Sequence, residues 1–221
     1  MLKELALSFV LFASNLSTMN AEEHKPFIGK TEAQSLNTNI MTPEALWAMG
    51  RISASTPSPD GKYIAWQSMA NNGYESDRNR LCVYNLATGE KKYVTESFES
   101  GVDSYCWAAD NHTLYFTGVW HATSMIYQTN LNGEVKKLTE GDYDYASVAM
   151  MGDQIITKRH SISHADEIYT LNPADGQIAQ LSHENDHIFN QLALGKVEAR
   201  WTTATDGKPL HSWVIYPSNF D

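Results

Sequence analysis

Serine, histidine and aspartate residues are scattered through this chain, and together these residue types can perform serine hydrolysis. Such catalysis needs a serine on a strained strand-to-helix turn, a histidine base and a carboxylate that orients the histidine. The turn that presents such a serine often reads Gly-x-Ser-x-Gly, and this pattern occurs nowhere in the 221 residues. We therefore predict that the chain contains no catalytic residue and is inactive alone.

Two pairs of residues could instead ligate a metal ion. His160 and His164 are four residues apart, a spacing that binds zinc on a helix, but their surroundings predict a strand end and a turn. Asp142 and Asp144 alternate with tyrosines, and a calcium loop would need further oxygen ligands and a glycine at defined spacing. We expect packing or solvent-exposed roles for both pairs, and neither a metal nor another cofactor.

The two cysteines, Cys82 and Cys106, lie in apolar, strand-like runs at Leu81–Leu86 and Tyr105–Trp107. Buried free thiols are favoured in such runs, and a disulfide is the alternative. No Cys-x-x-Cys spacing is present, so zinc and thiol-redox functions have no support.

The formal net charge of −10 argues against nucleic acid and anionic membrane surfaces as partners, because both attract clustered Lys and Arg. Residues 1–21 contain Lys3, the apolar run Leu5–Ala13 and small or polar residues up to Ala21. This order is typical of a secretory signal peptide, and an ordinary N-terminal helix is the alternative. Polar residues 22–41 are expected to be flexible. The predicted localisation is secreted or periplasmic, with no membrane-spanning segment.

The elements that follow are predicted to be short strands. Thr42-Pro43-Glu44 begins a short helix that Gly50 ends. After Arg51, apolar runs alternate with turn dipeptides such as Asn132-Gly133 and Gly152-Asp153, which favour tight hairpins. The predicted strands are Tyr63–Met69, Leu81–Leu86, Lys91–Thr95, Ser104–Ala108, Thr113–Val119, Ser124–Asn130, Val135–Thr139, Ser147–Met151, Gln154–Arg159, Glu167–Leu171 and Ile178–Leu181.

A repeat indicates how these strands are grouped. Three sets of residues recur 42 to 44 positions apart: Tyr84, Tyr127 and Tyr169; Gly89, Gly133 and Gly176; and Thr95, Thr139 and Ser182. A period in the low forties with four strands per unit is typical of a β-propeller blade. The predicted fold class is therefore all-β, an incomplete β-propeller preceded by a short N-terminal helix.

The number of blades is low for a closed propeller. Residues 42–196 hold the helix and three units, and a fourth unit could begin at His187–Leu194. Closed propellers have about four to eight blades, so apolar blade faces would stay open at both ends. We expect these faces to be available for self-association.

Several stretches resemble one peptidase family. Thr42–Ser53 is similar to the opening of the propeller in secreted prolyl oligopeptidase-family enzymes, in the dipeptidyl aminopeptidase and acylaminoacyl-peptidase branch. Ser58-Pro59-Asp60-Gly61 resembles a blade motif that many propellers share. Glu198–Trp201, Thr205–Lys208 and the end at Phe220-Asp221 resemble the segment by which such enzymes cross from propeller to hydrolase domain.

The resemblance implies an α/β-hydrolase domain after Asp221, and 197–221 would be the crossing segment toward it. That domain is absent from the chain. The family propeller has seven or eight blades, and since both the opening helix and the crossing segment are present, we predict an internal loss of blades between Ser53 and Ser58.

The resemblance also implies a role for two predicted turns. Trp120 and His121 follow one second strand of a blade, and Arg159 and His160 follow the next. Such turns gather at one face of a propeller, and in the family one face covers the hydrolase active site. These four residues are therefore candidates for substrate gating, with plain loop packing as the alternative. The predicted function is the truncated, substrate-gating propeller portion of a secreted serine peptidase acting on peptides; the alternative is a stand-alone protein-binding module.

Overall fold

The computed structural model describes residues 55–70 and 76–220. The predicted signal peptide, the flexible segment 22–41 and the helix that begins at Thr42 lie outside these residues. Within them the structure is almost entirely β, and no helix is both long and apolar enough to cross a bilayer.

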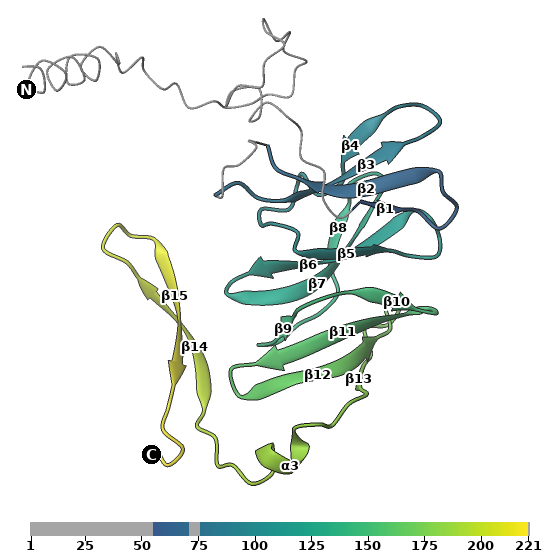
Figure 1. The fold of residues 1–221 in the computed structure, drawn as a ribbon. Helices are drawn as coiled ribbons and strands as arrows, with labels where there is room; N and C mark the ends of the chain where they lie inside the picture. The colour runs from purple at the N-terminus through teal and green to yellow at the C-terminus, as the bar shows by residue number, and fades with distance from the viewer. Residues whose placement is uncertain (1–54, 71–75, 221) are drawn as a thin grey trace, which may run out of the picture. The chain divides into compact units, whose positions relative to one another are not determined.

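Four antiparallel sheets follow one another along the described chain (Figure 1). The first contains β1 (Thr56–Pro57), β2 (Tyr63–Ser68), β3 (Arg80–Asn85) and β4 (Lys91–Tyr93). The second contains β5 (Ser104–Trp107), β6 (Thr113–Trp120), β7 (Thr123–Asn130) and β8 (Val135–Lys137). The third contains β9 (Asp144–Tyr145), β10 (Ala149–Met151), β11 (Gln154–Ser161), β12 (His164–Leu171) and β13 (Ile178–Gln180). The fourth is a hairpin of β14 (Val197–Thr203) and β15 (Pro209–Ile215).

The first three sheets are propeller blades, because consecutive strands pair in sequence order and the chain then moves on to the next sheet. In the third blade the first strand is divided, since β9 and β10 both pair with β11. The predicted strands match the observed ones to within a few residues at most ends.

A fourth blade does not begin at His187–Leu194, and that prediction was wrong. Asp186–Phe189 forms the single-turn helix α3, and backbone hydrogen bonds continue the turn to Leu192. The apolar residues of this stretch, which suggested a strand, are largely exposed: Ile188, Leu192 and Leu194. The described chain therefore contains three blades.

The repeated Thr or Ser closes each blade with a hydrogen bond that the sequence pattern did not reveal. In every blade this hydroxyl oxygen accepts a hydrogen bond from a backbone N–H of the third strand. The pairs are Thr95 with Leu81 (2.8 Å), Thr139 with Ile126 (3.0 Å) and Ser182 with Ile168 (2.8 Å). The hydroxyl thus satisfies a donor that lies beyond the end of the short fourth strand.

The repeated glycines occupy equivalent turns, but the repeated tyrosines do not all correspond. Gly89, Gly133 and Gly176 each follow the third strand and have positive φ angles of 73°, 88° and 76°, which glycine adopts without strain. Relative to the closing hydroxyl, however, Cys82 stands where the later blades have their tyrosines, and Tyr84 lies two residues further on. Side chains two residues apart lie on the same face of a strand. Tyr84 therefore lies on the same face of the first blade as Cys82, the face that carries the tyrosine in the later blades.

The core lies between the blades. Phe98, in the segment that joins the first two blades, packs edge-on against Phe116 (ring centroids 5.2 Å apart) and against Tyr127 (4.7 Å). Polar contacts accompany this packing, since the Tyr105 hydroxyl donates to the carbonyl oxygen of Ala65 (2.9 Å). Both cysteines are free, and burial raises the pKa of the Cys82 thiol to about 11 and that of Cys106 to about 12.

Candidate functional site

The turn between β6 and β7 carries the first pair of predicted gating residues. Trp120 pairs with Thr123, so His121 and Ala122 form a two-residue hairpin loop. Their φ angles are 54° and 58°, the left-handed region that such turns require and that Asn-Gly normally supplies. Two non-glycine residues in this conformation store backbone strain. The turn also holds the His121 ring stacked against Trp120, with ring centroids 4.7 Å apart.

The second pair of predicted gating residues, at the end of β11, is engaged in contacts within the third blade. The guanidinium of Arg159 lies over the rings of Tyr169 (3.7 Å) and Tyr143 (4.1 Å). The His160 ring lies between two carboxylates, with Nδ1 2.9 Å from Asp166 and Nε2 3.7 Å from Asp144. Arg159 and His160 therefore make these contacts within their own blade.

The carboxylate of Asp166 contacts both Lys158 and His160. Its Oδ2 accepts a hydrogen bond from Lys158 Nζ (2.8 Å). This bond, together with the charges of Lys158 and His160, lowers the pKa of Asp166 below its usual range. Asp166 is thus an anion throughout the neutral range.

The β14–β15 hairpin brings a third set of side chains to the same turns. In its register Ala199 faces Trp213 and Trp201 faces His211, so one side of the hairpin is aromatic. Trp201 stacks on His211 (centroids 4.5 Å apart) and meets the His121 ring edge-on (5.1 Å). We call the five rings that run from one element to the other the ring ladder: Trp120, His121, Trp201, His211 and Trp213.

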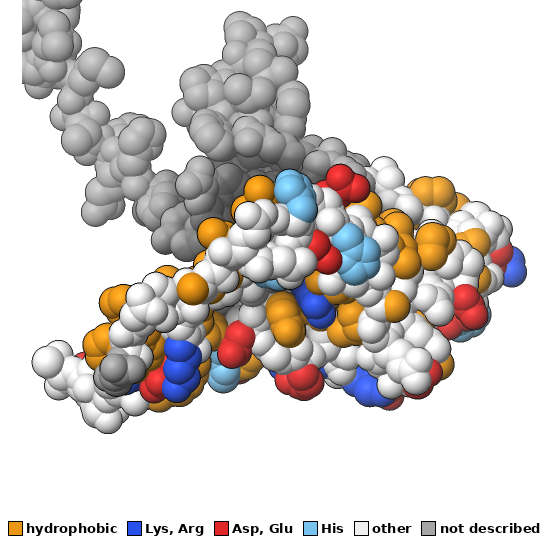
Figure 2. Space-filling model, turned by 90° about the horizontal axis from the view of Figure 1, so that it is seen from below, with side chains coloured by type: hydrophobic (Ala, Val, Ile, Leu, Met, Phe, Trp, Pro, Cys, Tyr) orange, Lys and Arg blue, Asp and Glu red, His pale blue; other side chains and the backbone are white. Residues whose placement is uncertain are grey.

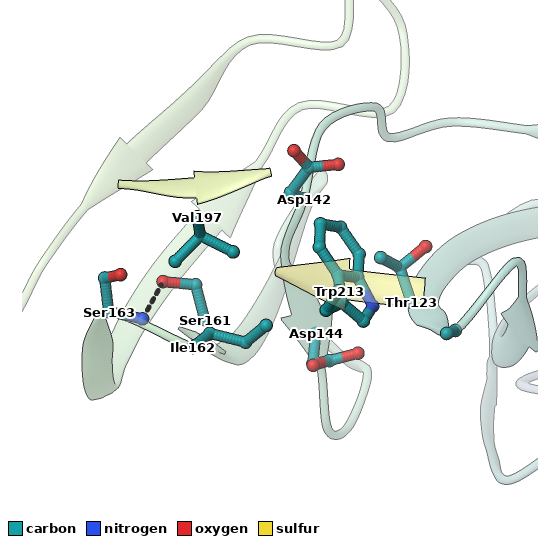
Figure 3. Close-up of a pocket in the computed structure, with 9 residues that line it drawn as sticks. Thr123, Asp142, Asp144, Ser161, Ile162, Ser163, Val197 and Trp213 are labelled. Atoms are coloured by element: carbon teal, nitrogen blue, oxygen red, sulfur yellow. Dashed lines mark hydrogen bonds between the residues drawn. The ribbon is translucent and has the colours of Figure 1, made fainter. Parts of the chain in front are cut away.

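A small pocket lies beside the ring ladder (Figure 3). Its volume is about 80 Å³, room for a few water molecules or one small chemical group. Its lining combines two carboxylates, hydroxyls and apolar walls: Ala122, Thr123, Asp142, Asp144, Ser161, Ile162, Ser163, Val197 and Trp213. The pocket therefore joins the second blade, the third blade and the hairpin.

The predicted gating residues surround this pocket without lining it. Trp120 and His121 precede the lining residue Ala122, and His160 contacts the lining residue Asp144. Sequence reasoning missed Val197 and Trp213, which belong to the predicted crossing segment. The signal available for Trp213 was its spacing of two residues from His211, which places both rings on one face of a strand.

The hydroxyl and carboxylate groups of the pocket are hydrogen-bonded to backbone groups at two positions. Ser161 Oγ accepts a hydrogen bond from the backbone N–H of Ser163 (3.3 Å) rather than contacting a histidine. Asp144 accepts one from the backbone N–H of Ser124 (2.6 Å). His164 stacks on Phe189 instead of converging with His160. In residues 55–70 and 76–220, no cluster of three or more His, Cys, Asp or Glu residues could hold a metal ion.

Comparison with known proteins identifies the class. No protein-family model matches the chain. It is 39% identical over 165 residues to dipeptidyl-peptidase 5 of Porphyromonas gingivalis, covering 74% of this chain and 24% of that protein. It is 35% identical over 187 residues to dipeptidyl-peptidase 5 of Porphyromonas endodontalis, covering 84% and 27%. The chain thus spans about a quarter of the length of the curated relatives that it matches.

Solved structures agree at the level of the fold. The acylaminoacyl peptidase of Pyrococcus horikoshii superposes with a TM-score of 0.59 at 21% identity, over 72% of this chain and 24% of that one. The AtxE2 isopeptidase with bound Astexin3-dC4 gives 0.58 at 15% identity, over 73% and 25%.

The blades and these relatives together define the class: the chain is a segment of a β-propeller, similar to the propellers of prolyl oligopeptidase-family peptidases. Its sequence is similar to the dipeptidyl-peptidases 5 of the two Porphyromonas species.

Proposed function

We propose that this chain supplies part of the substrate-gating propeller of a secreted or periplasmic serine peptidase that acts on short peptides. The observation that carries the proposal is the ring ladder, which joins the turns of one blade to the hairpin that follows the last blade. A hairpin fixed in this way would hold a following hydrolase domain over the same turns. Residues 1–21 would direct the chain to the secretory pathway.

The gating role follows from the position and chemistry of the turns. The turns at His121 and Ile162, together with the hairpin, would form the edge of a passage toward the serine of the hydrolase domain. The passage would admit short peptides and exclude folded proteins on size. The two carboxylates of the pocket, Asp142 and Asp144, would make this edge attractive to positively charged peptide groups.

The gene and its product test the proposal together. We expect the reading frame to continue past Asp221 into a Gly-x-Ser-x-Gly sequence, and the complete product to hydrolyse dipeptidyl substrates in a reaction that serine-directed inhibitors block. We expect the 221-residue chain alone to show no such turnover. A stop codon after Asp221, or inhibitor-sensitive turnover by the 221-residue chain alone, would contradict the proposal.

Gating is tested in the same complete product. Replacing Trp120 with Ala removes a large, 39% exposed ring from the turn, so kcat/KM for long peptides should rise relative to that for dipeptidyl substrates. The matched control is Trp107→Ala, which removes a tryptophan from the blade core instead. An unchanged ratio for Trp120→Ala would show that this turn does not select substrates.

A further inference from the structure

Each of the three blades carries the same apolar pair on the side that faces the following blade. In every blade, the residue before the closing Thr or Ser donates its backbone N–H to the carbonyl oxygen of the third-strand residue whose own N–H the closing hydroxyl accepts. The pairs are Val94 with Leu81 (2.9 Å), Leu138 with Ile126 (2.8 Å) and Leu181 with Ile168 (2.8 Å). The three pairs are thus structurally equivalent.

Their exposure differs sharply from the first blade to the third. Leu81, Val94 and Ile126 are fully buried, and Leu138 packs against the core. In contrast, Ile168 is 43% exposed and Leu181 is 52% exposed. The difference arises because a further blade covers the first two pairs; for example, Thr129 of the second blade donates its hydroxyl to the carbonyl oxygen of Val94 (2.6 Å).

The third pair belongs to a larger surface, which we call the third-blade face and define as Ile156, Lys158, Asp166, Ile168 and Leu181. Lys158 faces Ile168 in the strand register, and Ile156 lies two residues before it on the same side of β11. Figure 2, which views the molecule from the side of the third blade, shows hydrophobic side chains exposed among charged ones. The surface thus has the apolar centre and the charged margin of a protein interface.

We propose that the third-blade face binds the same face of a second copy of this chain, in a dimer with two-fold symmetry. A two-fold interface must be complementary to itself, and this face carries both signs of charge. Lys158 and Asp166 are 2.8 Å apart, and each is about half exposed. Across the two-fold axis, the lysine of one copy can meet the aspartate of the other while Ile168 and Leu181 pack in the centre.

The opposite end of the row of blades carries a different set of side chains. The position that faces a preceding blade is occupied by Tyr127 in the second blade and Tyr169 in the third, and by Cys82 in the first. Cys82 is fully buried, and Tyr84, two residues further on the same face, is half-buried. A second third-blade face is the partner that matches the exposed Ile168 and Leu181 with apolar side chains and the charges of Lys158 and Asp166 with opposite ones.

The test is the oligomeric state of the full 221-residue chain by light scattering and sedimentation across a range of concentrations. We expect a dimer for the unmodified chain and a monomer for the variant with Ile168→Asp and Leu181→Asp, which buries carboxylates at the centre of the interface. The matched control is Leu210→Asp, because Leu210 is 54% exposed on the hairpin; it should leave the dimer intact. Far-ultraviolet circular dichroism and thermal unfolding should show that all three proteins are folded.

A charge exchange gives a second measurement that does not depend on the double variant. Lys158→Asp alone should weaken the dimer at least tenfold, and adding Asp166→Lys should restore it. The proposal is wrong if the unmodified chain is monomeric, if the dimer survives Ile168→Asp with Leu181→Asp, or if the Leu210→Asp control also dissociates. Open-ended polymers would likewise overturn it, because they indicate head-to-tail stacking.

Discussion

Glu167 shows how one side chain ties the last blade to the segment that follows it. Its carboxylate is almost fully buried and accepts hydrogen bonds from the Ser182 hydroxyl and from the Asn185 backbone N–H (2.8 Å). The Ser182 bond first, and the Asn185 bonds with it, lower the pKa of Glu167 from 4.5 to about 2. The anion is thus bound more favourably in the folded chain than in the unfolded chain.

The stability of the chain should therefore depend on Glu167 in acid. Because the folded pKa is the lower one, the contribution is complete above pH 4.5 and is lost as the pH falls toward 2. In Glu167→Gln we expect a lower urea midpoint at neutral pH and a smaller loss of stability between pH 4.5 and 2. Glu90→Gln, at an exposed turn, is the control. Equal acid dependence in Glu167→Gln and the unmodified chain would refute this role.

The backbone conformation of Ala122 gives a second testable prediction about stability. Its φ of 58° is strained for alanine and unstrained for glycine. We expect Ala122→Gly to stabilise the chain by about 1 kcal/mol, measured by urea unfolding. If the variant is instead less stable, the methyl group of Ala122 contributes more through its contacts than the turn loses in strain.

At the scale of elements, the first two blades pack closely because strand β6 of the second blade leaves space for an aromatic ring from the segment that joins them. Gly118 in β6 is such a position, since an added Cβ would lie 2.6 Å from Phe98 Cε1 and 2.9 Å from the carbonyl oxygen of Gly101. Phe98 is in turn held by Phe116 and Tyr127. The absence of a side chain at Gly118 is thus part of the contact between the first two blades.

Gly118→Ala should consequently destabilise the chain by about 1–3 kcal/mol, because the Phe98 ring must move out of a packed site. Gly101→Ala is a suitable control, since its Cβ would make only an ordinary contact at 3.5 Å with Asn79 N. Urea unfolding of both variants measures the difference. Similar stabilities for the two would mean that the Phe98 site can relax.

At the scale of the whole described unit, the contact between the blades and the terminal hairpin is made of rings rather than of shared strands. β14 and β15 pair only with each other, and the ring ladder connects them to the β6–β7 turn. Trp201 is itself 51% exposed. A connection of this kind fixes the hairpin with little buried area and can be released without unfolding a blade.

Trp201→Ala should separate these two parts. We expect amide hydrogen exchange to become at least several-fold faster in residues 197–215, while exchange in β6, β7, β11 and β12 stays unchanged. Mass spectrometry of peptic fragments measures both regions at once. Leu210→Ala, on the other side of the hairpin, is the control and should not change either region.

The sequence was sufficient for the local features of this chain, and the structure was needed for the contacts between them. Strand alternation, turn dipeptides and the recurring glycines depend on neighbouring residues, so they predicted the blades. Four features depend on contacts between segments, and the sequence did not predict them. They are the hydrogen bonds of the closing hydroxyls, the shifted position of Tyr84, the helix at Asp186 and the divided first strand of the third blade. Of the four gating candidates, Trp120 and His121 belong to the ring ladder, whereas Arg159 and His160 are held within their own blade.

The sequence by itself therefore determined that this protein contains a row of propeller blades similar to those of prolyl oligopeptidase-family enzymes. Only the tertiary structure decided which residues meet at the pocket and which apolar residues stay uncovered. The physical reason is distance along the chain: His121 and Trp201 are eighty residues apart in sequence and in contact in space. Similarly, Ile168 and Ile126 look alike in sequence, and only the presence or absence of a following blade makes one exposed and the other buried.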